Sequence, residues 1–156
     1  MKFKNIFPKL KYFFLIIILQ IFPICCEKES CDVVPDTYIN ITLEPILLTL
    51  GPTQSAVITN IYAGQPSLGY DNNGIIIYCN SPEEYFSYDR TCPYHVEESI
   101  PVDAVNNGMY AVCPVCSSEY QLWFSGFPTD GSVSQCPLKQ YKTSYNPNFN
   151  TINIYN

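Results

Sequence analysis

Apolar and polar residues alternate along this chain in a series of short stretches, each about as long as one β-strand. In residues 37–43 the apolar residues Ile39, Ile41 and Leu43 share one face of the expected strand. Residues 75–78, which read Ile-Ile-Ile-Tyr, follow the turn signal Asp-Asn-Asn-Gly and predict a buried strand. The same reasoning predicts strands over residues 56–62, 84–89, 109–112, 119–124, 138–142 and 150–155.

No window of useful length has the 3.6-residue period of a helix. Thirteen prolines and thirteen tyrosines favour short strands and ordered loops over helices. The expected fold is therefore all-β, a small sandwich or barrel that occupies residues 37–156. Residues 96–108, mixed polar and acidic, are expected to be its longest loop.

The first 25 residues have the organisation of a signal peptide. Four lysines lie within residues 2–11, and residues 12–22 are almost wholly apolar. Eleven residues are too few to span a bilayer, which takes about 20, so cleavage is favoured over a retained membrane anchor. Residues 26–36, which are mostly polar, are expected to form a tether.

Two cysteines, Cys25 and Cys26, end the apolar run and precede a charged segment. This arrangement resembles the processing site of a bacterial lipoprotein, and it predicts lipid on Cys26, or on Cys25. The chain would then be an exported, membrane-anchored lipoprotein of the bacterial cell envelope. Plain secretion with cleavage nearby is the alternative.

Loss of residues 1–25 would leave four basic and fourteen acidic residues, a net charge of −10. A surface this acidic repels nucleic acid and anionic lipid, so nucleic-acid binding is excluded as a function class. Neither a Ser-His-Asp order nor a phosphate-binding loop is present, and an enzymatic role has little support.

Two short loops carry the strongest chemical signal. The first cysteine loop, residues 92–95, reads Cys-Pro-Tyr-His, and the second cysteine loop, residues 113–116, reads Cys-Pro-Val-Cys. Seventeen residues separate them, and His95 is the single histidine of the chain. The spacing C-x2-H-x17-C-x2-C suits a zinc or iron–sulfur site with Cys92, His95, Cys113 and Cys116 as ligands.

The order of these pieces resembles a Rieske-type iron–sulfur domain. Residues 74–78 resemble the strand that precedes the first ligand loop, and residues 84–93 resemble the strand that enters it. Residues 111–120 resemble the second ligand loop with its exit strand, and Gly126, residues 137–141 and the strand of Ile152 and Ile154 complete the pattern. The resemblance implies a Rieske-like β fold with both loops at one tip, a 2Fe–2S cluster and one-electron transfer to an unidentified redox or surface protein.

The ligand set departs from the Rieske pattern, which uses C-x-H and C-x2-H so that two histidines bind one iron. Cys92 and Cys113 match the two cysteine ligands, but Tyr94 and Cys116 occupy the two histidine positions. One molecule with a single histidine cannot build the two-histidine centre.

Three interpretations of the loops stay open. The four residues hold a 2Fe–2S cluster through three thiolates and one imidazole, or they hold a structural zinc ion. In the third interpretation no metal binds, and Cys92 pairs with Cys113 or Cys116 in a degenerate Rieske-like accessory or binding protein. Export favours disulfides, and Cys136 is expected to pair with Cys79 or with Cys31.

Overall fold

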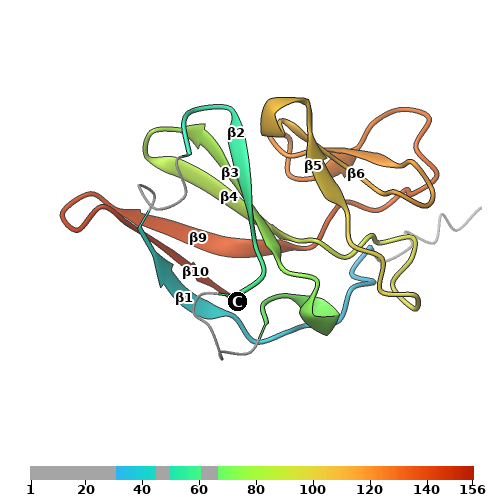
Figure 1. Cartoon of the computed structure of the whole chain (residues 1–156), viewed down its shortest axis with the longest axis horizontal. Coiled ribbons are helices and arrows are strands. Elements are labelled where there is room, and N and C mark those ends of the chain that lie inside the picture. Colours follow the sequence, from blue (N-terminus) through green and yellow to red (C-terminus); the bar gives the residue numbers. More distant parts are fainter. Residues whose placement is uncertain (1–30, 45–49, 61–66) are drawn as a thin grey trace, which may run out of the picture. The chain divides into compact units, whose positions relative to one another are not determined.

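Ten β-strands and two one-turn 3-10 helices make up the regular structure in a computed structural model that describes residues 31–44, 50–60 and 67–156. The all-β prediction is therefore confirmed. Six strands form one antiparallel sheet in the order β1-β10-β9-β4-β3-β2 (Figure 1). Their bounds are β1 Asn40–Leu43, β2 Gln54–Ile58, β3 Ile75–Ser81, β4 Glu84–Asp89, β9 Gln140–Asn146 and β10 Thr151–Tyr155.

The second sheet is smaller and is inserted between β4 and β9 of the first. It has the order β5-β6-β7-β8, with β5 Asp103–Val105, β6 Tyr110–Val112, β7 Glu119–Gln121 and β8 Phe127–Pro128. The 3-10 helix η2, Asn106–Gly108, joins β5 to β6, and η1, Tyr70–Asn72, precedes β3. The insertion places the first cysteine loop where the chain leaves the first sheet, and the second cysteine loop between β6 and β7.

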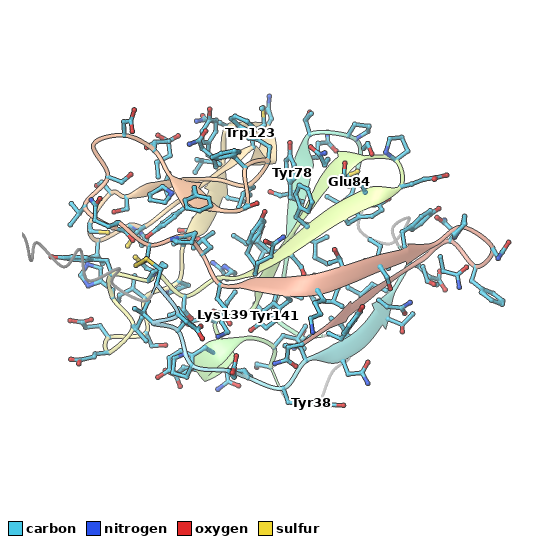
Figure 2. The ribbon with its side chains drawn as sticks, turned by 180° about the vertical axis from the view of Figure 1, so that it is seen from behind. Tyr38, Tyr78, Glu84, Trp123, Lys139 and Tyr141 are labelled. Atoms are coloured by element: carbon cyan, nitrogen blue, oxygen red, sulfur yellow. A yellow bond between two sulfur atoms is a disulfide. The ribbon has the colours of Figure 1, made fainter. Side chains whose placement is uncertain are left out.

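Strand β3 divides the interior into two cores, because its successive side chains point to opposite faces. Ile75, Ile77 and Cys79 pack into the first core, inside the six-stranded sheet, while Ile76 and Tyr78 pack into the second. Figure 2 shows Tyr78 pointing from β3 toward the second sheet. The second core also contains Cys92 and Cys113, so both cysteine loops begin inside packed apolar surroundings.

A buried tyrosine joins the two sheets. Tyr88, near the end of β4, donates its hydroxyl proton to the carbonyl of Leu122, which directly follows β7 of the second sheet, at 2.8 Å. Because Tyr88 and Leu122 are both fully buried, this hydrogen bond is shielded from water. It fixes the end of β4, and so the first cysteine loop, against the sheet that carries the second.

Most strands occur where the sequence pattern predicts them. The buried run at 75–78, the alternating faces around Ile41 and the apolar face of Ile152 and Ile154 are confirmed. Two strands differ from the prediction. The segment 96–108 was expected to be a loop, but it contains β5, which pairs with β6, and the fully buried Val102. Residues 127–128 form β8, a strand that the sequence pattern does not predict. With three and two residues, these strands are too short to show alternation.

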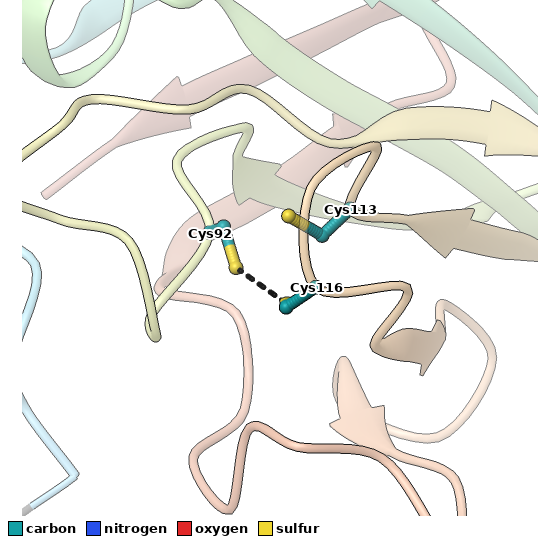
Figure 3. A group of neighbouring side chains, drawn as sticks. All are labelled: Cys92, Cys113 and Cys116. Atoms are coloured by element: carbon teal, nitrogen blue, oxygen red, sulfur yellow. Dashed lines mark hydrogen bonds between the residues drawn. The ribbon is translucent and has the colours of Figure 1, made fainter.

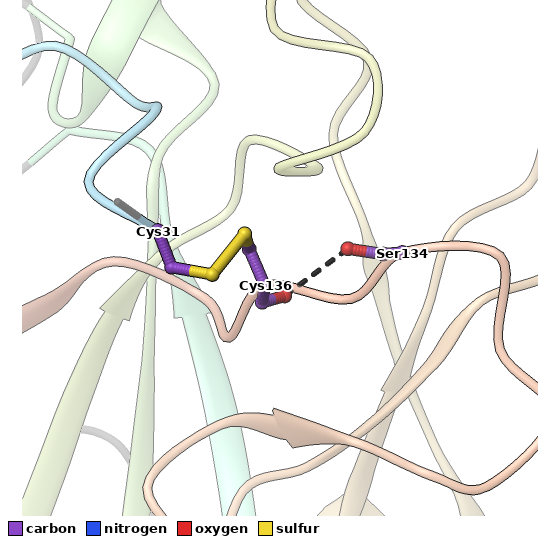
Figure 4. Close-up of a disulfide and its surroundings, with 3 residues drawn as sticks. All are labelled: Cys31, Ser134 and Cys136. Atoms are coloured by element: carbon purple, nitrogen blue, oxygen red, sulfur yellow. Dashed lines mark hydrogen bonds between the residues drawn. A yellow bond between two sulfur atoms is a disulfide. The ribbon is translucent and has the colours of Figure 1, made fainter. Parts of the chain in front are cut away.

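The compact unit begins at Cys31, so residues 31–36, expected to form a tether, belong to it. Cys31 forms a disulfide with Cys136 (Figure 4). The alternative pair Cys79–Cys136 is wrong, because Cys79 faces the first core from β3 and its thiol contacts the carbonyl of Ser81. Val34 is buried, and Lys139 near the start of β9 (Figure 2) contacts the segment through Asp32 and Asp36.

The predicted signal peptide and Cys26, the predicted lipidation site, lie outside the described residues. Within residues 31–44, 50–60 and 67–156, no helix is long and apolar enough to cross a membrane.

We expect Ile77→Ala to lower the free energy of unfolding by about 2–5 kcal/mol, because it leaves a cavity in the first core. Chemical unfolding followed by tyrosine and tryptophan fluorescence measures this change. Val57→Ala, on edge strand β2 with 41% of the residue exposed, is the control and should cost less than about 1 kcal/mol. Equal costs for the two variants would contradict the assignment of Ile77 to a packed core.

Candidate metal site

A buried carboxylate shapes the backbone that enters the first cysteine loop. Asp89, the last residue of β4, is fully buried. Its Oδ1 accepts from the N–H of Thr91 at 2.7 Å, and its Oδ2 accepts from the N–H of Tyr70 at 2.6 Å and the hydroxyl of Tyr141 at 2.7 Å. Three donors compensate for the burial of this group and hold the chain in place three residues before Cys92.

The loop itself is closed by backbone hydrogen bonds. Cys92 donates its N–H to the carbonyl of Ile100 at 2.8 Å, and its own carbonyl accepts from the N–H of His95 at 3.0 Å. The proline after Cys92 favours this turn because it fixes its own backbone angle. Cys92 is thus held from both sides and its side chain is fully buried.

The second cysteine loop turns tightly between β6 and β7. Cys113 donates its N–H to the carbonyl of Ser118 and accepts from the N–H of Ser117, both at 3.0 Å. Ser117 closes the turn with a φ of 58°, in the left-handed region that few residues other than glycine adopt. These contacts leave the side chain of Cys113 fully buried and that of Cys116 partly exposed.

The two loops bring three sulfur atoms together. The Sγ atoms of Cys92, Cys113 and Cys116 all lie within 4.8 Å of one another (Figure 3). Cys92 and Cys116 are 3.9 Å apart, a contact between thiols rather than a disulfide. Residues from two loops that are distant in sequence therefore form one cluster, as the spacing of the motif predicts.

Two hydroxyl groups line the cluster. The hydroxyl of Tyr120 lies 3.3 Å from the Sγ of Cys92, and the Sγ of Cys116 donates to the Oγ of Ser118 at 3.2 Å. The sequence alone assigns Tyr120 to packing and gives no role to Ser118. The available signal was register, because Ser118 directly precedes β7 and Tyr120 lies two positions further along, in the strand itself.

The thiols of Cys92 and Cys116 differ in acidity. Burial, reinforced by the neighbouring Cys113, raises the pKa of Cys92 to about 12, although the hydrogen bond with Tyr120 opposes this rise. Burial would also raise the pKa of Cys116, but hydrogen bonds with Ser118, Cys113 and Cys92 outweigh it and the pKa is lowered. Cys116 therefore becomes the reactive thiolate more easily than Cys92.

His95, the fourth predicted ligand, is close in sequence but is not a member of the sulfur cluster. Its Nδ1 lies 3.5 Å from the carboxylate of Glu98. Its Nε2 is buried, and among the described residues it has no hydrogen-bond partner. A buried ring nitrogen without a hydrogen-bond partner is free to bind a metal ion. Tyr94, at the histidine position of the Rieske pattern, is 56% exposed.

No protein-family model matches this chain, and no curated protein matches it either. Among solved structures the chain is similar to Rieske-type ferredoxins. The ferredoxin of carbazole 1,9a-dioxygenase from Nocardioides aromaticivorans IC177 is 10% identical, with a TM-score of 0.46 over 77% of this chain and 98% of that one. A ferredoxin from Sphingomonas yanoikuyae B1 is 15% identical, with a TM-score of 0.42 over 66% and 87% of the two chains.

With TM-scores below 0.5 and identities of 10% and 15%, this likeness carries no argument about the chain. What the site can do chemically follows from its own donors, which are three thiols and one imidazole.

In the metal-free, reduced protein we expect iodoacetamide at pH 8 to modify Cys116 at least about ten times faster than Cys92 or Cys113. The reason is that Cys116 is partly exposed and has a lowered pKa, whereas Cys92 and Cys113 are fully buried. Mass spectrometry of the peptides over time measures the three rates. Faster modification of Cys92 than of Cys116 would contradict this geometry.

Asp89→Asn is expected to destabilise the fold by about 1–3 kcal/mol. The NH2 group of the asparagine would face a group that now donates a hydrogen bond to the carboxylate, and two donors cannot pair. Thermal or chemical unfolding measures the loss. Asp103→Asn is the matched control, since Asp103 forms an ion pair with Arg90 but its side chain is 66% exposed. That change should cost no more than about 1 kcal/mol. An equal or larger cost for Asp103→Asn would refute the anchoring role of Asp89.

Proposed function

We propose that this chain is a one-electron carrier that holds a 2Fe–2S cluster through Cys92, Cys113 and Cys116, with His95 as the fourth ligand. One observation carries the proposal, namely the group of three thiols within 4.8 Å of one another at the meeting point of the two loops. The Rieske-type resemblance of the flanking strands supports the iron–sulfur choice. When bound, such a cluster would accept and donate single electrons.

The energetics of burial favour a metal at this place. Cys92 and Cys113 are fully buried, and a thiol is only a weak hydrogen-bond donor and acceptor there. Deprotonating them without a cation would bring negative charges together at low dielectric, which is costly. A bound metal centre compensates for that charge, and metal binding is then coupled to proton release from Cys92 and its neighbours.

The residues around the thiols would set the properties of such a centre. A thiolate in place of an imidazole adds negative charge and lowers the potential below that of a two-histidine centre. Once the thiols are deprotonated, the hydroxyls of Tyr120 and Ser118 would donate to the sulfurs of Cys92 and Cys116 and would act in the opposite direction, because hydrogen bonds to sulfur stabilise the more negative reduced state. The exposed Tyr94 and Val115, one on each loop, provide the surface that a redox partner would approach.

A structural zinc ion is the second candidate, and one distance is compatible with it. Two thiolates on one tetrahedral zinc, each about 2.3 Å from the ion, lie roughly 3.8 Å apart. The sulfurs of Cys92 and Cys116 are separated by 3.9 Å. With zinc, the four ligands would close the site and the protein would be a Rieske-like accessory or binding protein.

We further propose that the chain is exported and anchored by lipid on Cys26, which would place it in the bacterial cell envelope. The Cys31–Cys136 disulfide supports an oxidising compartment. The proposed role is electron delivery to a protein partner and not catalysis.

The decisive experiment is metal analysis with visible absorption and paramagnetic resonance spectra of the full chain, purified without oxygen. We expect about two irons per chain and a coloured, reducible chromophore. Cys113→Ser should abolish the chromophore, whereas Cys79→Ser, which removes a free thiol from the first core, should keep it.

Other outcomes are equally informative. One colourless zinc ion per chain, lost in Cys113→Ser, would replace the electron carrier by the structural alternative. Absence of both metals, together with a disulfide at Cys92, would overturn the metal proposal itself.

A further inference from the structure

The Cys31–Cys136 disulfide is connected to the sulfur cluster by an unbroken series of contacts. Two residues before Cys136, Ser134 donates its hydroxyl to the Cys136 carbonyl at 3.1 Å (Figure 4). The N–H of the same Ser134 donates to the Oγ of Ser118 at 2.9 Å. Ser118 in turn accepts from the Sγ of Cys116. Hydrogen bonds thus connect residues 134–136, which carry one end of the disulfide, through Ser118 to the thiol of Cys116.

Ser118 is the residue at which these contacts converge. It is fully buried, and its carbonyl also accepts from the N–H of Cys113. Ser134, which is 2% exposed, is buried as well. A buried hydroxyl that serves two partners keeps one orientation only while both partners stay in place.

The other side of the disulfide is held by a buried cation. Lys139, with its side chain 13% exposed, donates to Asp32 at 2.9 Å, to Asp36 at 2.8 Å and to the carbonyl of Val34 at 2.8 Å. These three bonds fix the segment that carries Cys31 against the start of β9. The disulfide therefore joins two segments that are each held in place, and Cys136 has little freedom to move.

We propose that the Cys31–Cys136 disulfide and the Lys139 contacts act together as a brace for the metal ligand Cys116. They position residues 134–136, which position Ser118, which orients the Cys116 thiol. The part of the inference that concerns metal retention rests on the proposed function above, whereas the part that concerns the Cys116 thiol does not. Since Cys31 is exposed at the surface, the brace can be reached from solvent.

The test compares the parent chain with the double variant Cys31→Ser/Cys136→Ser and with Ser118→Ala. The first readout is the alkylation rate of each remaining cysteine in the metal-free protein, followed by mass spectrometry of the peptides. We expect the rate of Cys116 to fall roughly three- to tenfold in both variants, because its thiolate loses the hydroxyl of Ser118 that stabilises it, as for the loss of about one hydrogen bond. The second readout is the rate at which the loaded protein releases metal to a chelator, which should rise by a similar factor.

Two further variants separate positioning from general loss of stability. Ile154→Val weakens the first core, far along the chain from Ser118, and should speed the alkylation of the buried Cys92 and Cys113 without slowing that of Cys116. Lys139→Met removes the contacts to Asp32 and Asp36 but leaves the disulfide intact, and should lower the rate of Cys116 by a smaller factor.

An unchanged alkylation rate of Cys116 in the double variant and in Ser118→Ala would overturn the brace. A parent protein that binds no metal would overturn the proposed function, and the alkylation rate of Cys116 would still decide the inference about this thiol. Should the double variant fail to fold, Ser118→Ala and Lys139→Met test the brace without removing the disulfide, and an unchanged rate of Cys116 in both would overturn it.

Discussion

The burial of β3 on both faces is the constraint on which this structure depends. A strand with five consecutive buried residues must be covered from two sides, and one sheet covers only one of them. The first core is closed by the six-stranded sheet itself, through β1, β9 and β10. The second core is closed by the inserted sheet, so the segment that carries the cysteine loops is also the cover of Ile76 and Tyr78.

In this arrangement the positions of the candidate ligands depend on the packing of the second core. Cys92 and Cys113 are members of the second core as well as candidate ligands, and Tyr88, which precedes Cys92 closely in the chain, links the two sheets. A change that loosens the second core therefore moves the ligands. Because Cys92 and Cys113 are packed in the second core, the two cysteine loops cannot rearrange independently of it. This favours a site with a fixed geometry.

Much of the fold was predictable because its strands carry their own pattern. Alternation around Ile41 and Ile154 and the apolar run of β3 locate three strands without any tertiary knowledge. Strands β5 and β8 were not predictable, because two or three residues show no period and are held only by pairing with β6 and β7. The spacing of the motif predicts that Cys92 lies close to Cys113 and Cys116. The disulfide partner of Cys136 was not predictable, because the sequence does not show that Cys79 faces the first core and so cannot reach Cys136.

The pairing of β1 with β10 has a consequence for the order in which the protein can be made. Thr42 of β1 bonds to Asn153 of β10 across a separation of 111 residues, and the side chain of Asn156 bonds to the backbone of Thr37 and Ile39. During synthesis β1 has no partner until β10 has emerged, although the strands of the inserted sheet can pair locally much earlier. The six-stranded sheet can therefore be completed only when nearly the whole chain has been made.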